Sequence, residues 1–239
     1  KTVCVVGAGM AGRAAARELR REGHAVTALE QAGDVGGQWL YDPRTDDPLG
    51  ASPAPVRVHS SMYASLRLIS PREAMGFTDF PFLPVAGAGG GGRAPRRFPG
   101  HREVLLYLKD FCDAFGLMDA VRLSLNTRVL RVAMAPPQCR APAVAGGERK
   151  WVVRSVRVGE RDDTGVQEEV FDAVVVATGH YSQPSVPTIK GMEAWRRRQL
   201  HSHSYRLPEP FRDEVLTATH FSISNHLGCM LCRHQPCHQ

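Results

Sequence analysis

The 239-residue sequence contains no apolar run long enough to cross a bilayer, and no basic-then-apolar signal segment opens it. We therefore expect no membrane segment. Lys and Arg outnumber Asp and Glu by 30 to 24, but they are not gathered into a stripe with interleaved aromatic residues, which argues against a nucleic-acid partner. No Ser/His/Asp or paired-carboxylate arrangement stands out, so we expect no catalytic residue of that kind.

Cysteine is sparse over most of the chain. Cys4, Cys112 and Cys139 are isolated, which is the pattern of reduced thiols in a cytoplasmic protein and not of a disulfide framework. Strand-like sequence begins directly after Lys1, so we expect the true N-terminus to be missing.

A glycine turn near the start is the sharpest motif. Thr2–Val6 predicts a buried strand, Met10–Glu22 a helix and Ala25–Glu30 a second strand, with G-x-G-x-x-G between the first two elements. Such a turn presents backbone amides to a pyrophosphate at the positive end of a helix. A carboxylate at Glu30 would accept hydrogen bonds from both ribose hydroxyls and repel a 2′-phosphate, so the unit predicts FAD or NAD and disfavours NADP. The predicted ligand-binding residues here are Gly7, Ala8, Gly9, Met10, Ala11, Gly12 and Glu30.

Two further segments complete the predicted site. Gly36 and Gly37 let backbone crowd against a cofactor, and Gln38 and Trp39 follow, with Trp39 as an aromatic wall. An NAD dehydrogenase would usually continue into another βα unit here, whereas this chain enters a long loop, which favours FAD over an NAD-linked oxidoreductase. Later, the predicted strand that ends at Val176 is followed at once by Ala177-Thr178-Gly179, as at the cofactor-facing edge of a doubly wound sheet.

The remaining pattern defines the fold class, which is α/β. We predict a Rossmann-like FAD-binding domain with a parallel sheet and an added three-stranded antiparallel meander. His101–Phe115 has the apolar face of a helix, and residues 85–95 form a glycine-rich insertion. The meander is expected over Thr127–Met134, Lys150–Val158 and Val166–Val176.

Four stretches of this sequence together resemble flavin-containing monooxygenases, especially the plant branch that oxygenates sulfur. The resemblance implies an FAD cofactor, reduction of the flavin by NADPH as co-substrate, and a flavin hydroperoxide that passes one oxygen to a small molecule with a soft sulfur or nitrogen nucleophile. The stretches are Gly7–Trp39, then Tyr63–Leu66 with Pro71–Phe82, then Arg97–His101, and last Ala177–Pro184 with Leu200–Arg206.

The sequence also departs from that family. The resemblance implies an asparagine near the flavin, but Ile69 occupies its position, so no catalytic residue is assigned. In the family's F-x-G-x-x-x-H-x-x-x-Y motif, Trp195, Arg197, His201 and Tyr205 stand at the fixed positions. Arginine for glycine predicts a rebuilt linker if the position needs a positive φ. His201 has a second interpretation, as a half-buried strand histidine.

The family runs on after Val215 into a second glycine-rich turn that binds NADPH, and this sequence has none. We therefore interpret residues 1–215 as the FAD-binding domain without the NADPH domain, and 216–239 as a disordered tail outside the family pattern. A retained intron or a shifted reading frame would explain the tail. Its Cys229, Cys232, Cys237 and His238 are weak zinc ligands, which leaves a zinc-binding interaction module open beside an inactive FAD-binding fragment.

Overall fold

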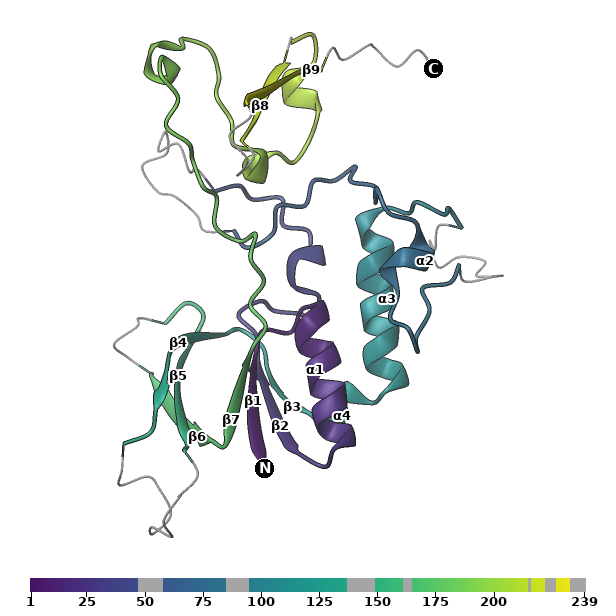
Figure 1. Cartoon of the computed structure of the whole chain (residues 1–239), viewed down its shortest axis with the longest axis vertical. Helices are drawn as coiled ribbons and strands as arrows, with labels where there is room; N and C mark the ends of the chain where they lie inside the picture. The colour runs from purple at the N-terminus through teal and green to yellow at the C-terminus, as the bar shows by residue number, and fades with distance from the viewer. Residues whose placement is uncertain are drawn as a thin grey trace.

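The computed structural model describes residues 1–46, 58–84, 95–136, 149–160 and 165–214, and the backbone of 216–221 and 227–232. Figure 1 shows three layers in its lower half, with helices on one face of a parallel sheet and an antiparallel sheet beside the other face. The chain after β7 leaves these layers and runs along the upper part of the molecule. This arrangement agrees with the predicted α/β class.

The parallel sheet has the strand order β3-β2-β1-β7. Its strands are β1 (Thr2–Val6), β2 (Ala25–Leu29), β3 (Arg122–Ser124) and β7 (Ala173–Val176), and every pairing is parallel. Because parallel strands end at the same edge, the residues that follow β1, β2 and β7 meet there. The three residues of β3 were not predicted as a strand, since so short a segment shows no periodicity.

The antiparallel sheet contains β4 (Thr127–Met134), β5 (Trp151–Arg157) and β6 (Gln167–Phe171), which confirms the added meander. The prediction of one strand over Val166–Val176 is wrong, because the chain divides at Asp172 between two sheets. The Asp172 carboxylate accepts from the amide of Thr2 at 2.6 Å and pairs with Lys150. Beyond it β7 forms the edge strand of the parallel sheet beside β1. Its residues are only partly buried, and Val176 is 67% exposed.

Four α-helices lie within the described ranges. They are α1 (Met10–Arg21), α2 (Arg72–Met75), α3 (His101–Ala114) and α4 (Leu117–Ala120). Gly23 and Gly116 follow α1 and α3 with φ of 77° and 57°, the left-handed conformation that ends helices. Short 3₁₀ turns are η1 (Gly37–Trp39), η3 (Met192–Ala194), η4 (Ser202–Ser204) and η5 (Glu209–Phe211). Among the described helices, none has the length and apolar character needed to cross a membrane.

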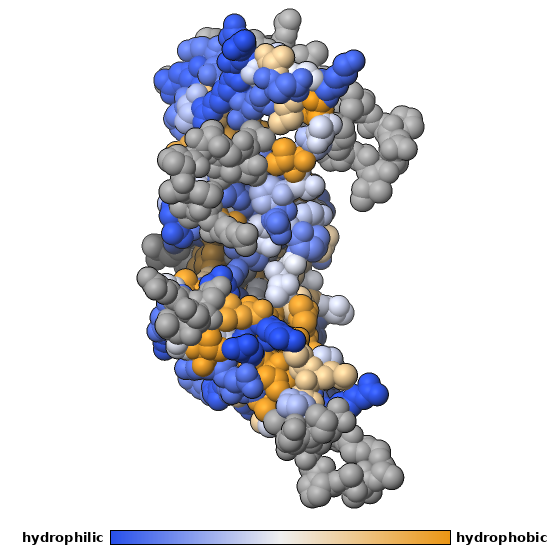
Figure 2. All heavy atoms as spheres, turned by 90° about the vertical axis from the view of Figure 1, so that its left-hand side faces the viewer, coloured by the Kyte–Doolittle hydropathy of each residue, from blue (hydrophilic) through white to orange (hydrophobic). Residues whose placement is uncertain are grey.

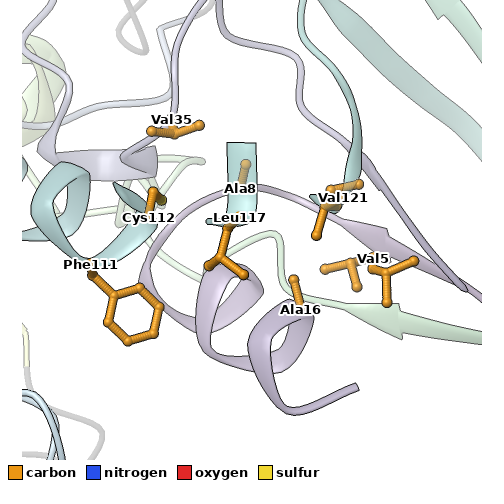
Figure 3. Close-up of a cluster of buried hydrophobic side chains, with 10 residues drawn as sticks. Val5, Ala8, Ala16, Val35, Phe111, Cys112, Leu117 and Val121 are labelled. Atoms are coloured by element: carbon orange, nitrogen blue, oxygen red, sulfur yellow. The ribbon is translucent and has the colours of Figure 1, made fainter. Parts of the chain in front are cut away.

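The main core joins the parallel sheet to the helices. Figure 3 shows Val5 of β1 and Ala16 of α1 beside Phe111 of α3 and Leu117 of α4. Ala8, in the turn between β1 and α1, belongs to the same cluster and is 1% exposed. The glycine turn is therefore anchored directly to the centre of the domain.

The antiparallel layer leaves apolar surface open. Figure 2 shows hydrophobic residues gathered in the lower half of the molecule, on the side where this layer lies, whereas the upper part of the molecule is mainly hydrophilic. Met134, Val158 and Val170, at or beside the strands of this layer, are each about half exposed, at 52%, 52% and 45%.

The C-terminal segment differs from the disordered tail that the sequence predicted. Its backbone forms the antiparallel strands β8 (Leu216–Phe221) and β9 (Leu227–Cys232), which pair from Leu216 with Cys232 to Phe221 with Leu227. The glycine-rich insertion lies outside the described residues except for Pro95.

Candidate dinucleotide-binding site

The glycine turn lies where β1, β2 and β7 end together. Gly7 has φ of 102°, and its amide donates to the carbonyl of Leu29 at 2.8 Å. A Cβ added at Gly7 would lie 2.5 Å from the carbonyl oxygen of Ala177, and one at Gly12 would lie 2.0 Å from the oxygen of Gly7. Side chains are excluded at both positions because strand, turn and helix backbones are packed directly against one another.

The N-terminus of α1 is open to an anion. Gly9 is its N-cap and supplies no side-chain hydrogen bond, and the first turn contains no acidic residue. The first amides of a helix have no partner within the helix, and the helix dipole is positive at this end. The amides of Met10 and Ala11, which have no acceptor within the helix, therefore lie at the position predicted for a pyrophosphate.

Glu30 lies beside this turn and is 6% exposed. Its Oε2 accepts from the amide of Ala8 at 2.6 Å, and its Oε1 accepts from the amide of Ala32 at 2.8 Å. Sequence reasoning placed the carboxylate correctly at the end of β2 but missed these two bonds, which fix it against the turn. An ionised carboxylate has about four acceptor positions, so Glu30 retains capacity for ribose hydroxyls.

The double-glycine segment packs onto the glycine turn through backbone alone. Gly36 and Gly37 have φ of 137° and 58°. The amide of Gly36 donates to the carbonyl of Ala8 at 3.2 Å, and a Cβ at Gly37 would lie 2.9 Å from the Cα of Gly9. The two segments that the sequence assigned to one cofactor site are thus in contact.

The residues after the double glycine are held differently from what was expected. The carbonyl of Gln38 accepts from the hydroxyl of Ser60 at 2.7 Å, so Gln38 anchors the loop through its backbone. Trp39 is 8% exposed and belongs to a second core cluster with Phe82, Val104 and others. Its indole therefore packs in the core beneath the segment, and its role as an aromatic wall of the cofactor site stays a prediction.

The end of β7 closes the other side of the turn. The amide of Ala177 donates to the carbonyl of Val6 at 2.8 Å, which continues the sheet past β7. The Cα of Thr178 lies 3.5 Å from the Cβ position of Gly7, and Thr178 and Gly179 are exposed. All three predicted segments consequently converge at one edge of the sheet.

Ile69 and Arg197 depart from the family pattern, and the structure shows the exposure of the first and the backbone conformation of the second. Ile69 is 96% exposed, although the neighbouring Leu68 is 8% exposed and packs in the second core cluster. Within the described residues, positive φ outside glycine occurs only at Asn126 and Asp213. The backbone of Arg197 therefore does not need glycine, and the reason for predicting a rebuilt linker does not apply there.

His201 caps the 3₁₀ turn η4, since its Nδ1 accepts from the amide of His203 at 3.1 Å. It is half-buried, but in a turn and not in the strand that was one interpretation. His203 is 4% exposed, and its Nδ1 lies 2.9 Å from the carboxylate of Asp46. These contacts give the histidines of this segment structural roles.

Arg206 fastens the same segment to the loops after the double glycine. It is 5% exposed, and burial is the main cause that lowers the pKa of its guanidinium. Five carbonyl oxygens accept from it, and no feature of the sequence indicated this cluster. They belong to Asp42, Arg44, Ser60, His203 and Tyr205, at 2.6 to 3.1 Å.

The weak zinc ligands of the tail are not tested by these contacts. The side chains of Cys229 and Cys232 are not described, and Cys237 and His238 lie outside the described residues. In the part of the chain whose side chains are described, no three His, Cys, Asp or Glu residues surround a metal position.

The fold and the converging glycine segments define a Rossmann-like dinucleotide-binding domain. Residues 1–225 match the family model described as flavin-binding monooxygenase-like. The chain belongs to this family.

Relatives in Arabidopsis thaliana support the assignment. The chain is 54% identical over 226 residues to flavin-containing monooxygenase FMO GS-OX-like 8, and 53% identical over 230 residues to FMO GS-OX-like 9. Each alignment covers 94% of this chain and 46% of the relative. The chain thus spans about half the length of the curated relatives it matches.

Solved structures agree. S-allyl-L-cysteine S-oxygenase from Allium sativum superposes with a TM-score of 0.73 at 44% identity, covering 88% of this chain and 43% of that one. Tmm from a Pelagibacter strain superposes with a TM-score of 0.65 at 26% identity, with the same coverage. The predicted Rossmann-like fold is confirmed.

Proposed function

We propose that this chain binds FAD and forms the flavin-binding part of an NADPH-using monooxygenase acting on small molecules with a soft sulfur or nitrogen nucleophile. The contact between Gly37 and Gly9 carries the proposal, because it places two glycine backbones around the amides of the α1 N-terminus. A Cβ at Gly37 would lie 2.9 Å from the Cα of Gly9, so a side chain there would push the double-glycine segment away from the turn. FAD therefore fits the residues that are present.

The chain's own residues would hold the cofactor by position and charge. The amides of Met10 and Ala11 would face the diphosphate, Glu30 would accept from the ribose, and Thr178 and Gly179 border the turn after β7. The amide of Ala8 donates to Glu30 and holds that carboxylate in place. When bound, a flavin accepts hydride from a nicotinamide and activates oxygen. The protein then contributes orientation and exclusion of water, which agrees with a site without an acid–base pair.

The sulfur preference rests on relatives, since the Allium sativum structure with 44% identity is an S-oxygenase. We propose a thioether as the first substrate to test. A flavin absorbance spectrum of the purified protein, with FAD identified after heat release, tests cofactor binding. A colourless protein that takes up no FAD on addition would refute the proposal.

A second candidate is an FAD-binding protein without monooxygenase turnover. The sequence favours it in one respect, because Ile69 stands where the family resemblance implies an asparagine near the flavin. NADPH oxidation stimulated by a thioether separates the two candidates. Stimulated oxidation with stoichiometric sulfoxide supports the monooxygenase, and a flavin spectrum without it supports the second candidate.

A further inference from the structure

Arg13 is a buried arginine in the first half of α1. It is 1% exposed, which makes it one of the largest fully buried side chains among the described residues. All three of its guanidinium nitrogens are buried, and none of them has a hydrogen-bond partner among the described residues. A buried cation usually has a paired charge or several carbonyl acceptors, as Arg206 does. The missing partners of Arg13 point to a ligand.

The surroundings of Arg13 place its charge near the glycine turn. Helix side chains lean toward the N-terminus of their own helix, which for α1 is the end formed by Gly9. Burial lowers the pKa of Arg13, while electrostatic interactions with Cys112, Glu30 and Asp34 act in the opposite direction. Arginine keeps its charge at neutral pH.

The two carboxylates near Arg13 are held differently. Asp34 is already paired with Lys109, whose Nζ lies 2.6 Å from its Oδ2. Glu30 is held by two backbone amides, and one of them, that of Ala8, belongs to the glycine turn itself. A diphosphate bound at this turn would add negative charge to that of the Glu30 carboxylate. Like charges repel more strongly in a protein interior than in water.

We propose that Arg13 is a positioning residue for the dinucleotide, whose buried charge offsets the combined negative charge of the diphosphate and Glu30. This inference rests on the proposed binding of FAD. Because the guanidinium is shielded from solvent, salt screens its effect far less than that of a surface charge. If Arg13 had no role in binding, its unpartnered charge would only lower the stability of the fold, and its removal would leave the affinity for FAD unchanged.

Arg13→Met separates these two roles, since methionine fills a similar volume without charge. We expect the cofactor-free variant to melt at a higher temperature than the wild type, because an unpartnered cation has been removed. We also expect its Kd for FAD, measured by quenching of flavin fluorescence, to rise about tenfold, and to do so equally at low and at high salt. Loss of stability and of affinity together would indicate a disrupted core and contradict the proposal.

Two further variants complete the experiment. Arg13→Lys keeps the charge and is expected to bind FAD within about threefold of the wild type. Arg21→Met removes an exposed arginine from the same helix, where Arg21 pairs with Glu18, and is expected to leave FAD affinity unchanged. An Arg13→Met protein that binds FAD as tightly as the wild type overturns this inference alone. Equal losses in the Met and Lys variants overturn it too, and a wild type that binds no FAD overturns the proposed function.

Discussion

Gly12 and Gly9 belong to the same turn but have different predicted roles, the first in folding and the second in cofactor binding. Replacing each of them by alanine separates the two roles. Gly12 is buried in α1, and its added Cβ would lie 2.0 Å from the carbonyl oxygen of Gly7 and 3.0 Å from its carbonyl carbon. Gly9 is the N-cap with φ of −74°, and its added Cβ would lie 3.5 Å from the Cα of Gly37, an ordinary contact.

The magnitudes follow from these distances. In an open helix, Gly→Ala would stabilise by about 1 kcal/mol. At Gly12 the overlap is with backbone, so helix and strand must separate, and overpacking of this kind costs about 1–3 kcal/mol. With the overlap at 2.0 Å we take the upper end, and Gly12→Ala should lose about 2 kcal/mol net, which lowers Tm by about 4–8 °C for a domain of this size.

Gly9→Ala should leave the cofactor-free protein within about 0.5 kcal/mol of the wild type. Alanine is a poorer N-cap than glycine, but it also reduces the entropy of the unfolded chain, and the two effects are similar in size. Its methyl group would instead lie between Gly9 and Gly37, beside the first turn of α1 where the diphosphate is proposed to bind. We expect the Kd for FAD to rise at least about tenfold, equivalent to about 1.4 kcal/mol.

Thermal melts of the cofactor-free variants and FAD titrations of the same preparations measure both quantities. The reasoning requires the two variants to differ in kind, with Gly12→Ala less stable and Gly9→Ala stable but weak in binding. If Gly12→Ala melted above the wild type, the close packing of turn and helix would be wrong. If Gly9→Ala bound FAD normally, the turn would not hold the diphosphate.

Three other changes test separate contacts. Glu30→Gln replaces one carboxylate oxygen by an NH₂ group that faces a backbone amide, so urea denaturation should show a loss of about 1–3 kcal/mol; an unchanged midpoint would contradict the two short hydrogen bonds. The pKa of the Asp172 carboxyl lies far below its ordinary value, mainly because of the Lys150 ammonium and secondly because of the backbone amide of Thr2. The ionised Asp172 carboxylate therefore contributes its full share of folding stability above about pH 4, and this share is lost as the pH falls further. Asp172→Asn should consequently make the urea midpoint fall less steeply between about pH 4 and pH 2. An equally steep fall in both proteins would refute this. Arg206→Met removes a donor to five carbonyls and should expose the 200–206 segment to limited proteolysis, with cleavage mapped by mass spectrometry; unchanged resistance would show that other contacts hold it.

The sequence predicted those parts of the fold in which local pattern and long-range packing agree. The βαβ unit was predictable because its two apolar strands, glycine turn and acid occupy fixed spacings, and α3 because its buried face repeats regularly. The boundary at Asp172 was not, since β6 and β7 join without a loop and only pairing with different partners separates them.

In the candidate site, the backbone course of the three segments was predictable from the sequence, whereas the packing of their side chains was not. The positions of Gly37 and Thr178 follow from the fold, so their convergence was predictable. The indole of Trp39 could face either a cofactor or the core, and only the packing of the second core cluster decides it. The carbonyl cluster around Arg206 is set by loops without any periodicity, so no motif marks it.

The position of β1 in its sheet has a consequence for synthesis. β1 precedes the other strands of its sheet along the chain, yet it lies between β2 and β7, and β7 follows the whole antiparallel meander. One edge of β1 therefore stays without its neighbour until the ribosome has made residues 173–176. Ala177, which packs against Gly7 of the glycine turn, directly follows that strand. The cofactor can therefore stabilise the domain only late in translation. A pause after the meander would thus prolong a state with an exposed strand edge and an incomplete nucleotide site.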